Sequence, residues 1–194
     1  MTALANAWCQ LEPLQSGHAA ELAPAAHDAQ IWRYMPTPMP VGEEGMRTWI
    51  ADRLRRDHPA RGHVFLVRDG AGNAAGSTSL YHHDALQRRA EVGYTWYGTP
   101  WHGTGLNKAV KRLLLEWAFD RLGLRRVQLK CDGRNEASRR AIEALGAVYE
   151  GTLRQHDEVW DGHMRDAAVF SILESEWPDV RDALDARLDA LNKR

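Results

Sequence analysis

The sequence predicts an α+β fold with a mixed, mostly antiparallel central sheet flanked by helices. Strand-like runs dominate the first half, and glycine-rich turns separate several of them. From residue 106 onward, helical and strand-like segments alternate. The chain has 194 residues, of which 44% are hydrophobic, so it can bury the core of one domain. We find no internal repeat and no linker, and we expect a single domain over residues 1–194.

The first half is expected to contain several strands and two helices. A strand should span residues 8–14, and Ser16 is the candidate N-cap of the helix that follows. Prolines in the stretch 32–40 exclude a helix there. A second helix should carry Met46, Trp49, Ile50 and Leu54 and end before Pro59. Further strands are expected at 63–68, 74–81 and 90–97, the first two joined by the hairpin turn 69–73.

The second half alternates helices with strands. Apolar residues between 106 and 118 fall on one helical stripe, and Gly123 suits the left-handed position after a helix. A strand at 126–130 and a helix from Asn135 come next, which implies a parallel crossover connection. The remaining expected elements are a strand at 147–153, a hairpin turn at 161–162, a strand at 164–173 and a tail helix from Pro178.

Composition narrows the classes of partner. The formal net charge is -1, so the protein lacks the field that gathers nucleic acid or an acidic membrane. No apolar run is long enough to cross a bilayer and the first residues do not resemble a signal peptide, so we expect a cytoplasmic protein. Cys9 and Cys131 are too few for a disulfide framework and are not a metal-binding pair. These features favour a small molecule or a peptide end as substrate, with no metal.

A glycine-bearing turn carries the main functional signal. A turn between a strand and a helix leaves backbone N–H groups unpaired beside the positive end of the helix dipole, which suits a diphosphate. Glycine lets the backbone approach such a ligand closely, and Lys108 adds a cation. The turn lacks the ending of an ATP-binding P-loop and the third glycine of a dinucleotide fingerprint. A turn that binds nothing is the local alternative. The residues concerned are His102, Gly103, Thr104, Gly105, Leu106 and Asn107.

From Glu91 to Trp177 the chain resembles the GNAT superfamily of N-acetyltransferases, in particular its RimJ/RimL-like branch. The matching segments agree in order and spacing, and they are 91–94 (Glu-Val-Gly-Tyr), 101–105 (Trp-His-Gly-Thr-Gly), 119–127, 135–147 and 150–154. The family's pyrophosphate motif is Gln/Arg-x-x-Gly-x-Gly/Ala. Its anchors correspond here to His102, Gly105 and Asn107, and two of the three differ. The upstream half, where such enzymes usually build the acceptor pocket, agrees only loosely.

The resemblance implies acetyl-CoA as co-substrate and direct transfer without a covalent enzyme intermediate. The pantetheine arm would lie between two splayed parallel strands, 91–97 and 126–131, with Trp96 and Tyr97 among its contacts. Asn135 would touch this arm, and Ser138 would donate a hydrogen bond to the departing thiolate. Helix capping alone is the alternative for the Asn-x-x-Ser pattern.

The acceptor amine must lose a proton, so a general base is needed. Glu91 is the first candidate, because the resemblance places a carboxylate on that strand and burial would make it more basic. The alternative is an ion pair with Arg88 or Arg89. The run His82-His83-Asp84 is the second candidate group, and a solvated turn is the alternative reading of it.

Three further features have both a functional and an ordinary interpretation. Tyr149 is a possible acid or a packing residue. Cys131 could form an acyl-cysteine or be an inert buried thiol. The aromatic-prolyl stretch 32–40 could wall the acceptor site or pack into the core.

The predicted function is acetyl transfer from acetyl-CoA to a primary amine, either a peptide or protein N-terminus or a small amine. One alternative keeps the fold as a non-catalytic acyl-CoA sensor, with catalysis lost through the departures at His102 and Asn107. Another is an interaction protein that uses its eight tryptophans and tail helix, which could pair two copies as a homodimer.

Overall fold

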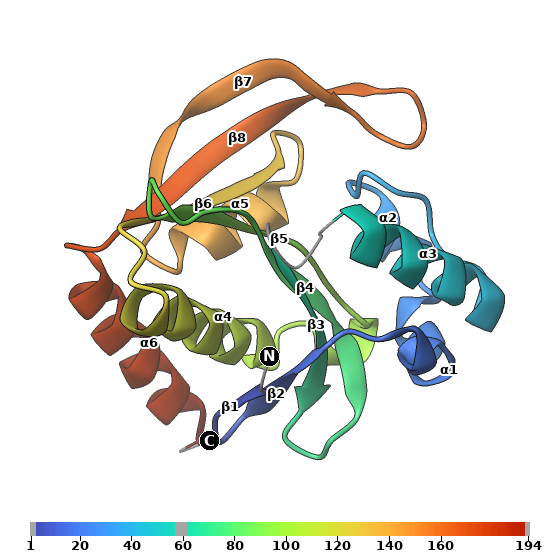
Figure 1. Cartoon of the computed structure of the whole chain (residues 1–194), viewed down its shortest axis with the longest axis horizontal. Coiled ribbons are helices and arrows are strands. Elements are labelled where there is room, and N and C mark those ends of the chain that lie inside the picture. Colours follow the sequence, from blue (N-terminus) through green and yellow to red (C-terminus); the bar gives the residue numbers. More distant parts are fainter. Residues whose placement is uncertain (1–2, 57–61, 193–194) are drawn as a thin grey trace.

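The computed structural model describes residues 3–56 and 62–192. These residues form one eight-stranded sheet with helices on both faces (Figure 1). The strand order is β1-β2-β3-β4-β5-β6-β8-β7, and among the strands of these described residues only β5 and β6 pair in parallel. The predicted mixed, mostly antiparallel sheet is therefore confirmed.

The expected strands are all present, with some differences at their ends. The short first strand was not expected, and β4 and β7 run further than the sequence pattern indicated. Their bounds are β1 Leu4–Ala5, β2 Cys9–Pro13, β3 His63–Asp69, β4 Ala74–Asp84, β5 Arg89–Tyr97, β6 Arg126–Asp132, β7 Val148–Glu158 and β8 Met164–Leu173.

The helices also follow the expected order, except that α2 was not expected. Ser16 was wrongly predicted as an N-cap, because Gln15 caps a 3-10 turn at Ser16–His18 through reciprocal bonds with His18. The predicted helix end before Pro59 lies outside the described residues. The helices are α1 Ala19–Leu22, α2 Ala29–Trp32, α3 Gly42–Arg56, α4 Leu106–Glu116 with a π-helical turn at Trp117–Arg121, α5 Glu136–Glu143 and α6 Trp177–Asn192. None of those in the described ranges has the length and apolarity needed to cross a bilayer.

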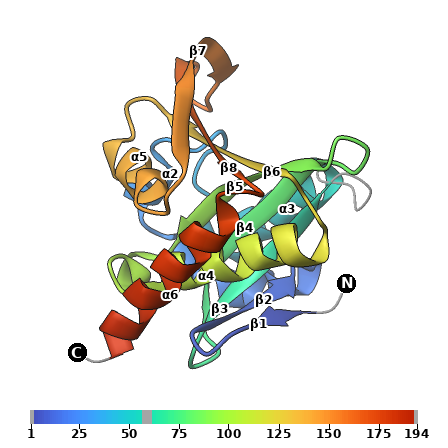
Figure 2. The same ribbon diagram turned by 90° about the vertical axis from the view of Figure 1, so that its left-hand side faces the viewer.

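Two hydrophobic clusters stabilise the two faces of the sheet. On one face, α4 and α6 pack together, and Val180, Leu184 and Leu188 of the tail helix are buried there (Figure 2). On the other face, Trp32 and Trp96 pack with their ring centroids 5.1 Å apart beneath α3. The apolar face that the tail helix could have offered to a second copy is therefore used within the chain.

The parallel strands part in the middle of the sheet. Residues 89–92 of β5 pair with 126–129 of β6, and the pairing stops at Val92 and Leu129. Just beyond, β5 bulges against β4, and Tyr94 has a φ of 49°. A bulge bends and twists its strand, so it directs the end of β5 away from β6. This opening positions the site.

Candidate active site

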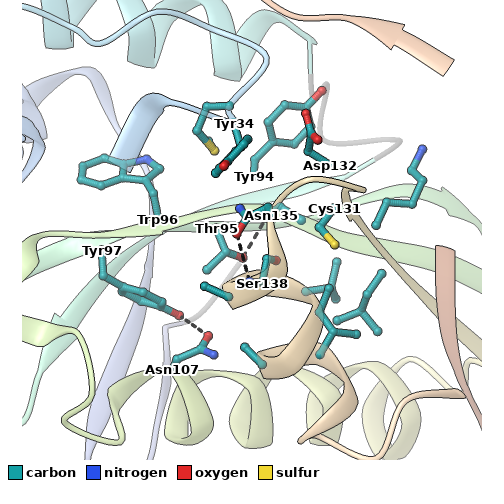
Figure 3. Close-up of a pocket in the computed structure, with 18 of the residues that line it drawn as sticks. Tyr34, Tyr94, Thr95, Trp96, Tyr97, Asn107, Cys131, Asp132, Asn135 and Ser138 are labelled. Carbon is teal, nitrogen blue, oxygen red and sulfur yellow. Dashed lines mark hydrogen bonds between the residues drawn. The ribbon is translucent and has the colours of Figure 1, made fainter. Parts of the chain in front are cut away.

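A cavity of about 730 Å³ lies where β5 and β6 separate (Figure 3). Its walls come from the ends of both strands, the turn before α4 and the start of α5. Residues 34–36 and the β7–β8 hairpin close the other side. The hairpin is tied to this region because Trp160 Nε1 donates to the carbonyl oxygen of Trp32 at 3.2 Å. Segments distant in sequence thus meet around one opening.

Most of the residues predicted to bind the cofactor line this cavity. Thr104 and Leu106 are exceptions: the Thr104 hydroxyl bonds the carbonyl oxygen of Trp101 at 2.9 Å, and Leu106 is buried in the core. Trp96 lines the cavity but is also packed in the second hydrophobic cluster. The predicted residues on the wall are Trp96, Tyr97, His102, Gly103, Gly105, Asn107, Lys108, Asn135 and Ser138.

The turn before α4 presents unused backbone donors. The amide of His102 bonds the carbonyl oxygen of Thr99 at 3.1 Å, and that of Leu106 reaches Thr104 Oγ1 at 3.3 Å. Between them, the amides of residues 103–105 make no hydrogen bond to any part of the chain that the structure describes. Gly103 and Gly105 have φ values of 76° and 94°, which only glycine adopts readily. The turn can therefore receive an anion.

The two residues that depart from the family motif brace this turn. Tyr97 donates its hydroxyl to Asn107 Oδ1 at 3.3 Å (Figure 3), and His102 Nε2 lies 3.0 Å from the carbonyl oxygen of Tyr97. Burial raises the pKa of Tyr97 well above its usual value, so its hydroxyl stays protonated and can donate. His102 and Asn107 thus fix the turn to the end of β5.

The predicted Asn-x-x-Ser pattern caps α5 at the edge of the cavity. Asn135 Oδ1 accepts a hydrogen bond from the backbone amide of Ser138 at 3.0 Å, and both residues line the cavity (Figure 3). Nearby, burial raises the pKa of Cys131, although its contact with Ser138 opposes the rise. The Cys131 thiol is therefore protonated at neutral pH and is a poor nucleophile.

Glu91 lies behind the cavity wall and not on it. The side chain is almost fully buried, accepts a short hydrogen bond from the Tyr81 hydroxyl, and lies 3.2 Å from Lys130 Nζ. The expected alternative partners are wrong, because Arg88 bonds Gly123 and Glu174 while Arg89 faces Asp84. Tyr81 and Lys130 line the cavity, so Glu91 contacts it through its neighbours.

Of the predicted run 82–84, His82 is the residue that lines the cavity. The sequence favoured a solvated turn for residues 82–84, but they continue β4. The ring is 72% exposed, and its Nδ1 lies 3.8 Å from Glu91 Oε2. His82 has a φ of 51°, which turns it away from the regular alternation of the strand. Asp84 instead accepts a hydrogen bond from the amide of Gln87.

Two carboxylates on the wall were missed by the sequence analysis. Burial alone would raise the pKa of Asp132, but hydrogen bonds from Arg134 lower it below its usual value. Burial alone would also raise the pKa of Asp157. Arg165 lies 2.7 Å from its carboxylate, however, and the hydrogen bond between them lowers the pKa below its usual value. Both groups are therefore ionised at neutral pH. The β7–β8 hairpin was predicted, but Asp157 lies beyond the predicted end of its first strand at residue 153, because β7 continues to Glu158 and pairs with β8 there.

The remaining candidates divide between wall and core. Trp32 is buried in the second cluster, which confirms the core-packing interpretation for that residue, whereas Tyr34, Met35 and Pro36 line the cavity. Tyr149 lies outside the cavity, and its hydroxyl pairs with Thr152.

Comparisons with known proteins agree with this geometry. The family model "Acetyltransferase (GNAT) domain" matches residues 9–148. A Bacillus subtilis (strain 168) protein named "Putative ribosomal N-acetyltransferase YdaF" is 36% identical over 106 residues, and the match covers 55% of this chain and 57% of that protein. The chain thus spans little more than half of that relative's length.

Solved structures extend the likeness over most of the chain. A GCN5-related N-acetyltransferase from Brucella melitensis is 30% identical with a TM-score of 0.88, covering 95% of this chain and 84% of that one. The acetyltransferase RimL, solved in complex with coenzyme A, is 18% identical with a TM-score of 0.74, covering 89% and 98%, and shows the shared fold. The chain belongs to the GNAT family of acetyltransferases.

Proposed function

We propose that this protein transfers an acetyl group from acetyl-CoA directly to a primary amine. One observation carries the proposal: the turn at residues 103–105, with its unpaired amides, lines the cavity through Gly103 and Gly105, and an ionisable group, His82 beside Glu91, lines the same cavity. The first feature suits a diphosphate, and the second suits removal of a proton.

The turn 103–105 and Lys108 would hold the diphosphate. The dipole of α4 and the amides favour the negative charge there, and the ammonium of Lys108 adds to it. Beyond Val92 and Leu129, the separated strands leave backbone groups that a pantetheine arm can pair with. Acetyl-CoA supplies a thioester, whose carbonyl carbon accepts the amine.

Glu91 acts in this proposal from behind the wall, through His82. The imidazole takes the proton that the amine loses, directly or through one water, and the carboxylate stabilises the imidazolium that forms. Lys130 Nζ lies 3.2 Å from the same carboxylate and forms an ion pair with it.

Ser138 assists departure of the thiolate. Its backbone is fixed by the Asn135 cap, and its side chain belongs to the cavity wall. A hydroxyl in that place can donate to a sulfur that gains negative charge as the C–S bond breaks. The raised pKa of Cys131 favours this direct route over an acyl-cysteine.

The acceptor is an amine that arrives as an ammonium. Asp132 and Asp157 are ionised and line the cavity, so each carboxylate can accept a hydrogen bond from the ammonium in addition to its ion pair with Arg134 or Arg165. A peptide or protein N-terminus and a small amine both satisfy this requirement. The name of the B. subtilis relative, a putative ribosomal N-acetyltransferase, adds weight to an amine of a protein.

The proposal is tested by following thiol release from acetyl-CoA in the presence of peptides and small amines. We expect amine-dependent release, with acetylated amine formed in equal amount. Binding of acetyl-CoA without release across the panel would instead identify a sensor. If neither binding nor a thermal shift occurs at saturating acetyl-CoA, the protein is not an acetyltransferase, because a ligand of the folded state must stabilise it.

A further inference from the structure

Lysine is rare in this chain and concentrated at the cavity. There are four lysines, of which Lys108, Lys111 and Lys130 line the cavity, and Lys193 lies outside the described residues. Arginine supplies the other cations. A guanidinium keeps its charge in proteins, whereas a buried lysine can lose its proton and become a nucleophile.

The three cavity lysines have different surroundings. Lys108 is half-buried beside the phosphate turn, and Lys130 Nζ lies 3.2 Å from the carboxylate of Glu91. Lys111 is 5% exposed and donates to Thr95 Oγ1 at 2.7 Å. Within residues 3–56 and 62–192, no carboxylate lies within ion-pair distance of Lys111.

Burial without a counter-charge disfavours the ammonium form. Burial accordingly lowers the pKa of Lys111 from 10.5 to about 7. The neighbouring charge on α4 does not offset this effect, because Arg112 pairs with Asp185 and Glu116 and not with Lys111. Tyr97, on the facing strand, is protonated at this pH because burial raises its pKa. A large fraction of the protein therefore has a free lone pair on this nitrogen at neutral pH.

Lys111 is also placed where its amine can reach a ligand in the cleft. It lies one helical turn after Asn107, on the same face of α4, which points into the cleft. Its partner Thr95 directly follows Tyr94 at the bulge, and Thr95 Oγ1 is also bonded to Thr78 Oγ1 at 2.7 Å. The amine is thereby held against the strand expected to flank the thioester.

We propose that Lys111 is a site of self-acetylation, modified when acetyl-CoA is bound and no acceptor amine is present. The inference rests on the proposed function. The lone pair of Nζ attacks the thioester carbonyl carbon, a C–N bond forms and the C–S bond breaks. The proton lost by the nitrogen passes to the departing sulfur, which gives N-acetyl-lysine and coenzyme A.

The test incubates the full chain with acetyl-CoA alone and maps acetylated peptides by mass spectrometry over time. Calorimetry on the same sample records whether acetyl-CoA binds. We expect one acetyl group, added at Lys111 about tenfold or more faster than at Lys108 or Lys130, because Lys130 is held in an ion pair with Glu91 and Lys108 lies beside the phosphate turn. Lys111→Met, of similar length and without an amine, should lose this label.

Two additions separate an active-site reaction from general lysine chemistry. Excess coenzyme A should protect Lys111, and acetyl phosphate, which lacks the coenzyme A arm, should leave it unlabelled. Binding of acetyl-CoA without label at Lys111 would overturn the inference and leave the proposed function intact. Equal labelling of Lys108 or Lys130 would also overturn it. Absence of binding would overturn both.

Discussion

The guanidinium of Arg53 lies over the ring of Tyr94, with its central carbon 3.4 Å from the ring centroid. Tyr94 has a φ of 49°, a conformation that costs a residue with a side chain about 1 kcal/mol. Helix α3 therefore holds the bulge of β5 in an unfavourable backbone conformation at the point where the cleft opens.

Replacing this cation should loosen the bulge. We expect Arg53→Met to lower the free energy of unfolding by about 2 kcal/mol, through loss of the buried cation–π contact and its hydrogen bond to Ser79. Urea unfolding measures this. Arg55→Met, on the same helix but 78% exposed, is the control and should change less than about 0.5 kcal/mol. Equal effects from both variants would show that the contact does not hold the bulge.

The glycines of the phosphate turn allow a matched test of binding. A Cβ at Gly103 would meet no atom within 4 Å, so Gly103→Ala strains only the backbone and crowds the anion position. We expect acetyl-CoA to bind about tenfold more weakly by calorimetry. Gly72→Ala carries the same strain at a φ of 88° in the β3–β4 turn, again with open space, and should leave affinity unchanged. Gly105 is a poorer choice, because its Cβ would meet Leu191 at 2.5 Å.

If Glu91 acts through His82, the two residues form one unit. Glu91→Gln and His82→Asn should each lower kcat by about a hundredfold, and the double variant should be little slower than either single one. Steady-state turnover with acetyl-CoA and an active amine gives these values. If the loss of kcat in the double variant equalled the product of the two single losses, Glu91 and His82 would act independently. A normal kcat in Glu91→Gln, with altered stability alone, would make the Glu91–Lys130 pair structural.

Burial of Lys111 makes stability depend on pH in a defined direction. Above a pKa of about 7 the folded protein has lost this proton, whereas the unfolded chain keeps it until about 10.5. Stability from this group therefore rises with pH across that window and falls as the pH drops toward 7. Between pH 7 and pH 9 the free energy of unfolding of the wild type should rise by about 2 kcal/mol more than that of Lys111→Met, as measured by urea unfolding at each pH. Identical gains would mean that Lys111 is charged in the folded state.

The sequence predicted helices and strands with a clear hydrophobic periodicity, but it predicted the ends of these elements less well. The stripe of α4 and the cap at Asn135 are local features, and the structure confirms both. The two-residue strand β1 has too few residues for a pattern. His82 was misjudged because a bulge carries β4 past a segment whose composition resembles a turn.

The sequence predicted only part of the site, because local motifs reveal some of its residues and tertiary packing brings in the others. Gly103 and Ser138 belong to local motifs, whereas Asp157 enters through strand pairing and Glu91 is separated from the cavity by Tyr81. Lys111 did leave a signal, since it follows Asn107 by four residues on the cleft face of α4. A lysine on that face could have been singled out from the helical spacing alone.

A crystal structure with acetyl-CoA tests the central claim most directly. We expect diphosphate oxygens within hydrogen-bond distance of the amides of residues 103–105, and the thioester between the separated ends of β5 and β6. Acetyl-CoA bound elsewhere, with those amides facing solvent or the protein's own atoms, would contradict the account.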